Sequence, residues 1–178
     1  LVLVRFTSFD GTVVLRSSAY DVATSLREAQ IYSVSVVSTD GNFRYPYGLT
    51  FVPGTVSYTF FQFRSSDTDD FPVFDLLNGP SEDVIRVIGL AGSTEIADLC
   101  VVVGASPDCD VNRLDVSFRR PEFAALIWAD GPSPANVSAT RIYLESTRNP
   151  GNVWIVEIKL LGQITVYKCT APLSTPTV

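Results

Sequence analysis

Residues 152–166, with the sequence NVWIVEIKLLGQITV, constrain the fold of this 178-residue chain more than any other segment. Large apolar side chains recur mostly at every second position, which is the period of a β-strand with one buried face. This face comprises Trp154, Val156, Ile158, Leu160, Ile164 and Val166. The opposite face carries Glu157, Lys159, Gln163 and Thr165. We therefore expect one long strand near the end of the chain, with a bend or bulge at Gly162.

Strand patterns and turn residues also dominate the rest of the sequence. Further strands are expected at 1–7, 11–17, 31–37, 49–63, 83–90, 99–105, 112–118 and 141–147. Pro53-Gly54 interrupts the segment 49–63, which predicts either a strand pair or a long bent strand. Helical spacing predicts a short helix over 17–30, and Pro121 fits the first turn of a second short helix over 121–129.

This order of elements predicts an all-β protein with a single domain over residues 1–178. About eight strands with one or two short helices between them are typical of an eight-stranded antiparallel jelly-roll sandwich. In a jelly roll the last strand joins the sheet that contains the first strand. The long strand at 152–166 is therefore expected to complete a sheet opened near the N-terminus.

The charged residues exclude several classes of function. The chain has no histidine, which removes Ser-His-Asp triads, Cys-His pairs and His-ligated zinc sites. Thirteen lysines and arginines face 19 acidic residues, so the net charge is −6. No basic patch or tail for nucleic-acid binding is visible. Because no spacing marks a nucleophile or a carboxylate pair, we predict a protein that is not an enzyme and has no catalytic residue.

The cysteines leave two interpretations open. Cys100, Cys109 and Cys169 are three thiols without a C-x-x-C spacing. A disulfide between Cys100 and Cys109 could close a hairpin in a secreted protein. Buried thiols are the interpretation that we favour from sequence alone.

Acidic clusters provide the weak candidates for a metal site. Asp67, Asp69 and Asp70 lie within four residues and could supply oxygen ligands to a Ca²⁺ shared between subunits. Asp108 and Asp110, on either side of Cys109, are weaker candidates of the same kind. The spacing does not match an EF-hand, so solvated loops are the favoured interpretation and no metal is expected.

Three other motifs bear on binding or modification. Arg119-Arg120 is the only adjacent cation pair, and it could contact RNA phosphate or a neighbouring subunit, although an ordinary exposed pair is more common. Gly89–Ser93 lacks the lysine and the glycine spacing of a phosphate loop, which indicates a turn. Asn136-Val137-Ser138 matches the N-glycosylation rule, which has meaning only in a secreted protein.

The order of segments is similar to that of one family of viral proteins. A helix ending in SLREAQI runs into IYSVSVV and is followed by LTFVPG. Later in the chain come RLDVSF with a Pro-led helix, TRIYLEST, RNPGN, and IKLLGQITV followed by APLS. This order resembles the coat protein of tymoviruses and their relatives. The resemblance implies a jelly-roll shell domain without a long basic arm. Members of that family carry histidines to which pH-dependent RNA contacts are ascribed, and these have no counterpart here.

The resemblance implies a structural coat protein that self-assembles into an icosahedral T=3 shell around a positive-sense RNA genome. Its partners would be other copies, in pentamers and hexamers, and genomic RNA. Because the subunit is acidic, we expect no cofactor but packaged polyamines or divalent cations. The protein would be found in the virion and, during assembly, in the host cytoplasm. No segment has about 18 to 20 uninterrupted apolar residues, so no membrane partner is expected.

The alternative hypothesis is a secreted or surface β-sandwich that binds carbohydrate or protein. Phe43, Tyr45 and Tyr47 would then form an aromatic contact loop. This alternative would also explain the Asn136-Val137-Ser138 motif and a Cys100–Cys109 disulfide.

Overall fold

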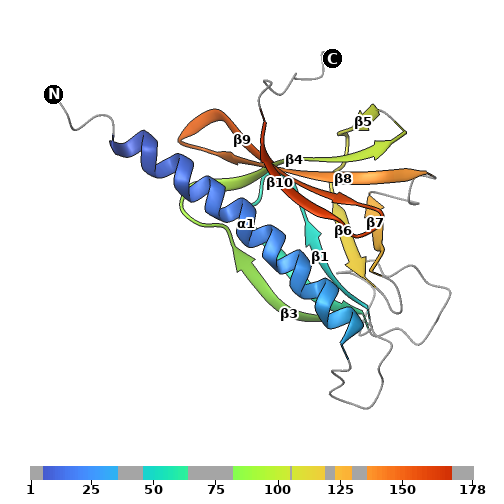
Figure 1. Cartoon of the computed structure of the whole chain (residues 1–178). Coiled ribbons are helices and arrows are strands. Elements are labelled where there is room, and N and C mark those ends of the chain that lie inside the picture. Colours follow the sequence, from blue (N-terminus) through green and yellow to red (C-terminus); the bar gives the residue numbers. More distant parts are fainter. Residues whose placement is uncertain are drawn as a thin grey trace.

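Most of the ordered elements in the computed structural model are strands (Figure 1). The structure describes residues 6–35, 46–63, 82–104, 106–118, 123–129 and 136–169. The elements in chain order are α1 (Phe6–Val34), β1 (Tyr47–Phe51), β2 (Ser57–Phe63), β3 (Glu82–Gly89), β4 (Thr94–Val103), β5 (Ser106–Asp108), β6 (Leu114–Phe118), β7 (Ala125–Ala129), β8 (Val137–Ser146), β9 (Asn149–Lys159) and β10 (Ile164–Lys168).

The strands form two antiparallel sheets. Sheet A has the order β3-β2-β1-β6-β7, and sheet B has the order β10-β9-β8-β4-β5. Their inner faces share one apolar core with α1, which contains Leu26 of the helix, Phe51 and Phe60 of sheet A, and Leu99 and Ile142 of sheet B. The prediction of an all-β sandwich is confirmed at this level, although the structure has ten strands in the described residues.

The expected link between the last strand and the first is wrong. β10 is an edge strand of sheet B, where it pairs with β9, whereas β1 lies in the middle of sheet A. Strand β1 pairs with β2 and β6 on its two sides. The long C-terminal strand therefore completes the sheet opposite the one that contains the first strand.

Helix α1 is the largest departure from the sequence-based prediction. Its 29 residues include the expected short helix at 17–30. They also include the expected strand at 11–17, residues 6–7 of the expected strand at 1–7, and residues 31–34 of the expected strand at 31–37. One face is fully buried and consists of Leu15, Ala19, Val22, Ala23, Leu26 and Ala29. These positions are three or four residues apart along most of the helix, so tertiary packing overrides the strand propensity of Val13 and Val14.

Several expected strands are confirmed. Residues 49–63 form the β1–β2 hairpin, which turns at Pro53-Gly54. Gly54 has a φ of 73°, a conformation that glycine adopts without steric cost. The predictions at 83–90, 99–105, 112–118 and 141–147 correspond to β3, the end of β4, β6 and β8.

The second expected helix is wrong, because residues 125–129 of the segment 121–129 form strand β7. Ala125, Ile127 and Ala129 are buried, while Leu126 and Trp128 are half-buried. This is the two-residue period of a strand. All five residues pair with β6, so the segment extends sheet A.

The segment 152–166 forms two strands instead of one. β9 and β10 form a hairpin whose turn includes Gly162, at a φ of 83°. The predicted apolar face is confirmed for five residues, since Val156 and Ile158 lie in the core and Trp154, Ile164 and Val166 pack against it. The prediction is wrong for Leu160, which is 44% exposed because it lies in the turn.

Candidate functional site: an exposed helix face and a disulfide-bonded hairpin

Helix α1 packs against both sheets by its apolar face and by polar contacts along its length (Figure 1). Asn152 Nδ2 in β9 donates to Thr12 Oγ1 at 3.2 Å. Ser25 Oγ lies 3.0 Å from Tyr58 OH in β2, and burial of this phenol raises the pKa of Tyr58. Near the C-terminal end of α1, Gln30 Nε2 donates to Phe123 O at 3.0 Å. These contacts hold the helix to both sheets and fix which of its faces meets solvent.

The opposite face of α1 presents a continuous exposed stripe. Its six residues are Val13, Ser17, Tyr20, Thr24, Arg27 and Ile31, and all of them are exposed. The intervals between them are alternately four and three residues, which is the spacing that keeps side chains on one line of a helix. Val13, Tyr20 and Ile31 are 54%, 43% and 59% exposed, so the stripe offers large apolar side chains to solvent.

Charged residues of opposite sign lie on the two sides of the exposed stripe. Arg16 is on the side of sheet B, with its guanidinium 5.6 Å from the centres of the Tyr20 and Trp154 rings. Asp21 and Glu28 are on the other side, where Glu28 forms an ion pair with Arg86 of β3 in sheet A. The face of α1 is therefore basic along one border and acidic along the other.

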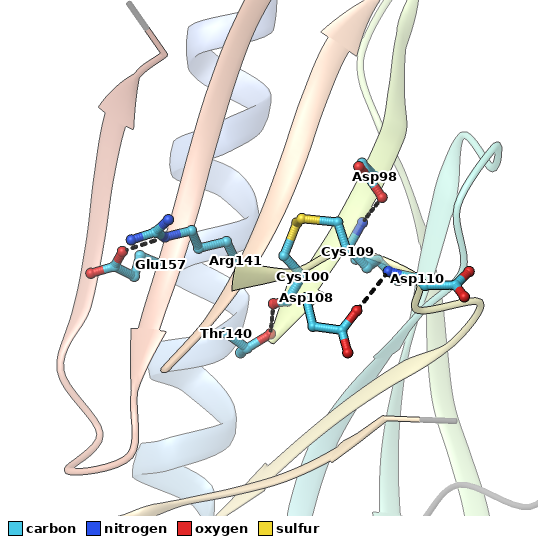
Figure 2. The surroundings of a disulfide bond; sticks show 9 residues. Asp98, Cys100, Asp108, Cys109, Asp110, Thr140, Arg141 and Glu157 are labelled. Atoms are coloured by element: carbon cyan, nitrogen blue, oxygen red, sulfur yellow. Dashed lines mark hydrogen bonds and ion pairs between the residues drawn. A yellow bond between two sulfur atoms is a disulfide. The ribbon is translucent and has the colours of Figure 1, made fainter. Parts of the chain in front are cut away.

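The second candidate region is the hairpin formed by β4 and β5. Cys100 and Cys109 form a disulfide across it, with their Cα atoms 4.0 Å apart (Figure 2). The interpretation of these two cysteines as buried free thiols is therefore wrong. Cys109 follows β5 directly, so the antiparallel pairing of β5 with β4 brings it back beside Cys100. Cys169 is not part of a disulfide.

Asp98 is an ionisable residue beside the disulfide (Figure 2). Its carboxylate lies within 4.8 Å of both sulfur atoms, and burial raises the pKa of this carboxyl. Metal binding by cysteine requires thiolates, and sulfurs bonded to each other are not thiolates. The three side chains therefore offer a metal only one charged ligand while the disulfide is intact.

An ion pair lies near the disulfide on sheet B, because Cys100 of β4 pairs with Arg141 of β8 (Figure 2). Arg141 Nε donates to Glu157 Oε2 at 2.8 Å across β8 and β9. Tyr167 OH in β10 donates to the same oxygen at 3.0 Å. Burial, with this hydrogen bond as the second cause, raises the pKa of Tyr167 to about 12. The phenol therefore stays protonated at neutral pH and acts as a hydrogen-bond donor.

The structure describes only some of the residues that the sequence singled out. The metal candidates Asp67, Asp69 and Asp70, the RNA-facing candidates Arg119 and Arg120, and the loop residues Phe43 and Tyr45 all lie outside the described residues. Tyr47 is described; it is half-buried in β1, and its ring contacts those of Tyr32 and Phe60. Tyr47 is therefore not part of an exposed aromatic loop.

The remaining candidates lie at turns. Asp108 and Asp110 are exposed beside the disulfide, and the Asp110 backbone N–H donates to Asp108 Oδ1 at 3.2 Å. The prediction of a turn at 89–93 is confirmed, with Gly92 at a φ of 64° between β3 and β4. Asn136 is exposed and has a φ of 73°, directly before β8.

The exposed stripe is not evident from the sequence, because the patterns at residues 11–17 and 31–37 predict strands. The signal that could have revealed it is the 3.6-residue period that links Leu15 to Ala29.

Comparisons with known protein families, with curated proteins and with solved structures found no match to this chain. Within the residues that the structure describes, no helix has the length and apolar character needed to cross a membrane.

Proposed function

We propose that this chain is a structural subunit of an assembly formed outside the cytoplasm, in which copies contact one another through α1. The observation that carries the proposal is the second, exposed stripe on α1, opposite the face that packs on the sandwich. A helix that covers a core needs one apolar face. Val13 and Ile31 are more than half exposed, and Tyr20 is 43% exposed although its ring lies 6.4 Å from that of Trp154; contact with another copy would bury the exposed parts of all three.

The shape of the molecule supports the same proposal. Twenty-nine residues of helix span about 43 Å at about 1.5 Å per residue. Figure 1 shows the first turns of α1 extending beyond both sheets. A projecting helix can contact neighbouring copies while the sandwich remains at the surface of the assembly. A contact between matching surfaces of identical subunits forms a closed symmetric pair.

The disulfide supports a location outside the cytoplasm. Bonds such as Cys100–Cys109 form and persist in oxidising environments and are rare in the cytosol. A non-enzymatic role agrees with the absence of histidine from the chain.

Electron microscopy and sedimentation velocity of the full chain, purified with its disulfide intact, test the proposal. We expect concentration-dependent association into dimers or larger oligomers that contain protein alone. A protein that remains monomeric at every concentration and salt condition would overturn it. Binding of such a monomer to a glycan array would instead favour the secreted binding module.

A viral coat protein is the second candidate function. Two antiparallel sheets and an acidic chain agree with the family that the segment order resembles. The coat-protein hypothesis implies a jelly roll, in which the last strand joins the sheet of the first. Strand β10 lies in the sheet that does not contain β1, which disfavours a jelly roll. Spherical particles containing RNA in the same micrographs would favour the coat protein over the assembly proposed here.

A further inference from the structure

We infer that the exposed stripe of α1 binds the same stripe of a second copy, and that the two helices run in the same direction. This inference rests on the proposed assembly and specifies its contact. The partner that binds the stripe is a second copy of the chain, because the basic border of one copy can meet the acidic border of the other in only one orientation.

The apolar part of the contact follows from the spacing of the stripe. Alternating intervals of four and three residues are those of the contact line between two packed helices. Val13, Tyr20 and Ile31 would provide the apolar contacts, while Ser17 and Thr24 are small enough to let the two helices approach. Thr24 Oγ1 already donates to Tyr20 O at 2.8 Å, so its hydroxyl needs no partner across the contact.

The borders of the stripe determine the direction of pairing. When two such helices face each other in parallel, the basic border of each lies beside the acidic border of the other. When they are antiparallel, basic meets basic and acidic meets acidic. Like charges in contact are unfavourable, so the two borders favour the parallel pair. Arg27, which lies on the stripe itself and would face Arg27 of the other copy in this pair, donates to Ile164 O of its own subunit.

One specific ion pair follows from the helical positions. Arg16 precedes the stripe residue Ser17, and Asp21 follows the stripe residue Tyr20. In parallel helix pairs, residues at these flanking positions that are five apart form salt bridges between the chains. Arg16 of each copy would therefore meet Asp21 of the other copy, twice in a symmetric pair. Glu28 is already paired with Arg86 within its own subunit and contributes less.

Charge reversal tests the ion pair by sedimentation velocity. We expect Arg16→Glu and Asp21→Arg each to weaken association about tenfold, because each change places like charges in contact twice. The double variant R16E/D21R should recover the original affinity. An equimolar mixture of the two single variants should also associate, since each then supplies the charge that the other lacks. Thermal unfolding of each variant shows whether the subunit remains folded.

Cross-linking tests the direction of the helices independently of affinity. The variants Val13→Cys and Ile31→Cys are made separately in a chain that also carries Cys169→Ser. Each is then treated with a short reagent that joins two thiols. A parallel pair links each variant to itself, and these positions are about 27 Å apart along the helix. Leu161→Cys, at a residue that is 85% exposed in the β9–β10 turn, is the matched control and should not be linked.

The outcomes separate this inference from the proposed function. Association that survives R16E and gives no link at Val13→Cys overturns the inference but leaves a self-assembling subunit. Links formed only in a mixture of Val13→Cys with Ile31→Cys indicate an antiparallel pair and also overturn it. If the unmodified chain does not associate, both the inference and the proposed function fail.

Discussion

Gly162 shows at the scale of single residues how closely α1 and the last hairpin are joined. An added Cβ at this position would lie 2.0 Å from Phe123 O and 2.6 Å from Gln30 Nε2. Gln30 Nε2 also donates to Gly162 O at 3.2 Å. The turn therefore leaves no room for a side chain where helix, hairpin and β7 meet.

We expect Gly162→Ala to lower the free energy of unfolding by about 1 to 3 kcal/mol through its positive φ, and further through the contact with Phe123. Gly54→Ala is the control, because Gly54 has a φ of 73° but no atom near an added Cβ. Urea unfolding of both variants measures the difference. Equal losses would show that the close contact at Gly162 costs nothing.

Tyr167 predicts the behaviour of the protein at alkaline pH. Its pKa in the folded state is about 12, above the ordinary value of 10.0. The folded state therefore holds the phenol proton more tightly than the unfolded state does. The resulting stability is complete below pH 10 and is lost as the pH rises from about 10 to about 12. The free energy of unfolding of Tyr167→Phe, measured by urea unfolding at each pH, should accordingly decline less steeply between about pH 10 and about pH 12 than that of the unmodified protein. A slope identical to that of the unmodified protein would contradict the assignment.

At the scale of elements, the disulfide determines the stability of the β4–β5 hairpin. β5 has only three residues, and all of them are exposed. Replacing Cys100 and Cys109 with serine should cost about 2 to 3 kcal/mol, because the closed loop restricts the unfolded chain. Thermal unfolding of this variant, with Cys169→Ser as the matched control, measures the loss. An unchanged midpoint would mean that the hairpin holds without the covalent link.

The elements also show what the sequence could and could not predict. The β1–β2 hairpin was predictable, because Pro53-Gly54 lies between two apolar runs. Trp154, Val156 and Ile158 were assigned to the correct face from the two-residue period alone. The bounds of α1 were not predictable in this way, because Val13 and Val14 favour strands and only the sheets that cover Leu15 make a helix preferable.

The candidate site was harder to predict for two physical reasons. Which face of α1 meets solvent depends on sheets whose strands lie far along the chain, so the exposed stripe is a tertiary property. Pairing of Cys100 with Cys109 depends on the oxidising power of the compartment, and the sequence does not encode that directly. The acidic composition, by contrast, is visible at once and bears on the whole molecule.

At the scale of the whole molecule, the net charge of −6 predicts weak binding to nucleic acid. Affinity for RNA comes largely from counterions released when cationic side chains contact phosphates. Gel shift with single-stranded RNA at physiological salt should therefore show no complex. Binding that weakens steeply as salt increases would reveal a basic surface and would favour the coat protein.

The packing of α1 also affects how the chain is made. Asn152 contacts Thr12 across 140 positions of sequence, and Gly162 contacts Gln30 across 132. Helix α1 is synthesised before β9 and β10, which pack against it. Until then Leu15, Val22 and Leu26 have no sheet B hairpin to pack against. Such distant contacts slow folding and expose the intermediate to aggregation. The buried face of α1 therefore remains exposed to solvent until β9 and β10 have been synthesised, which favours aggregation at that stage.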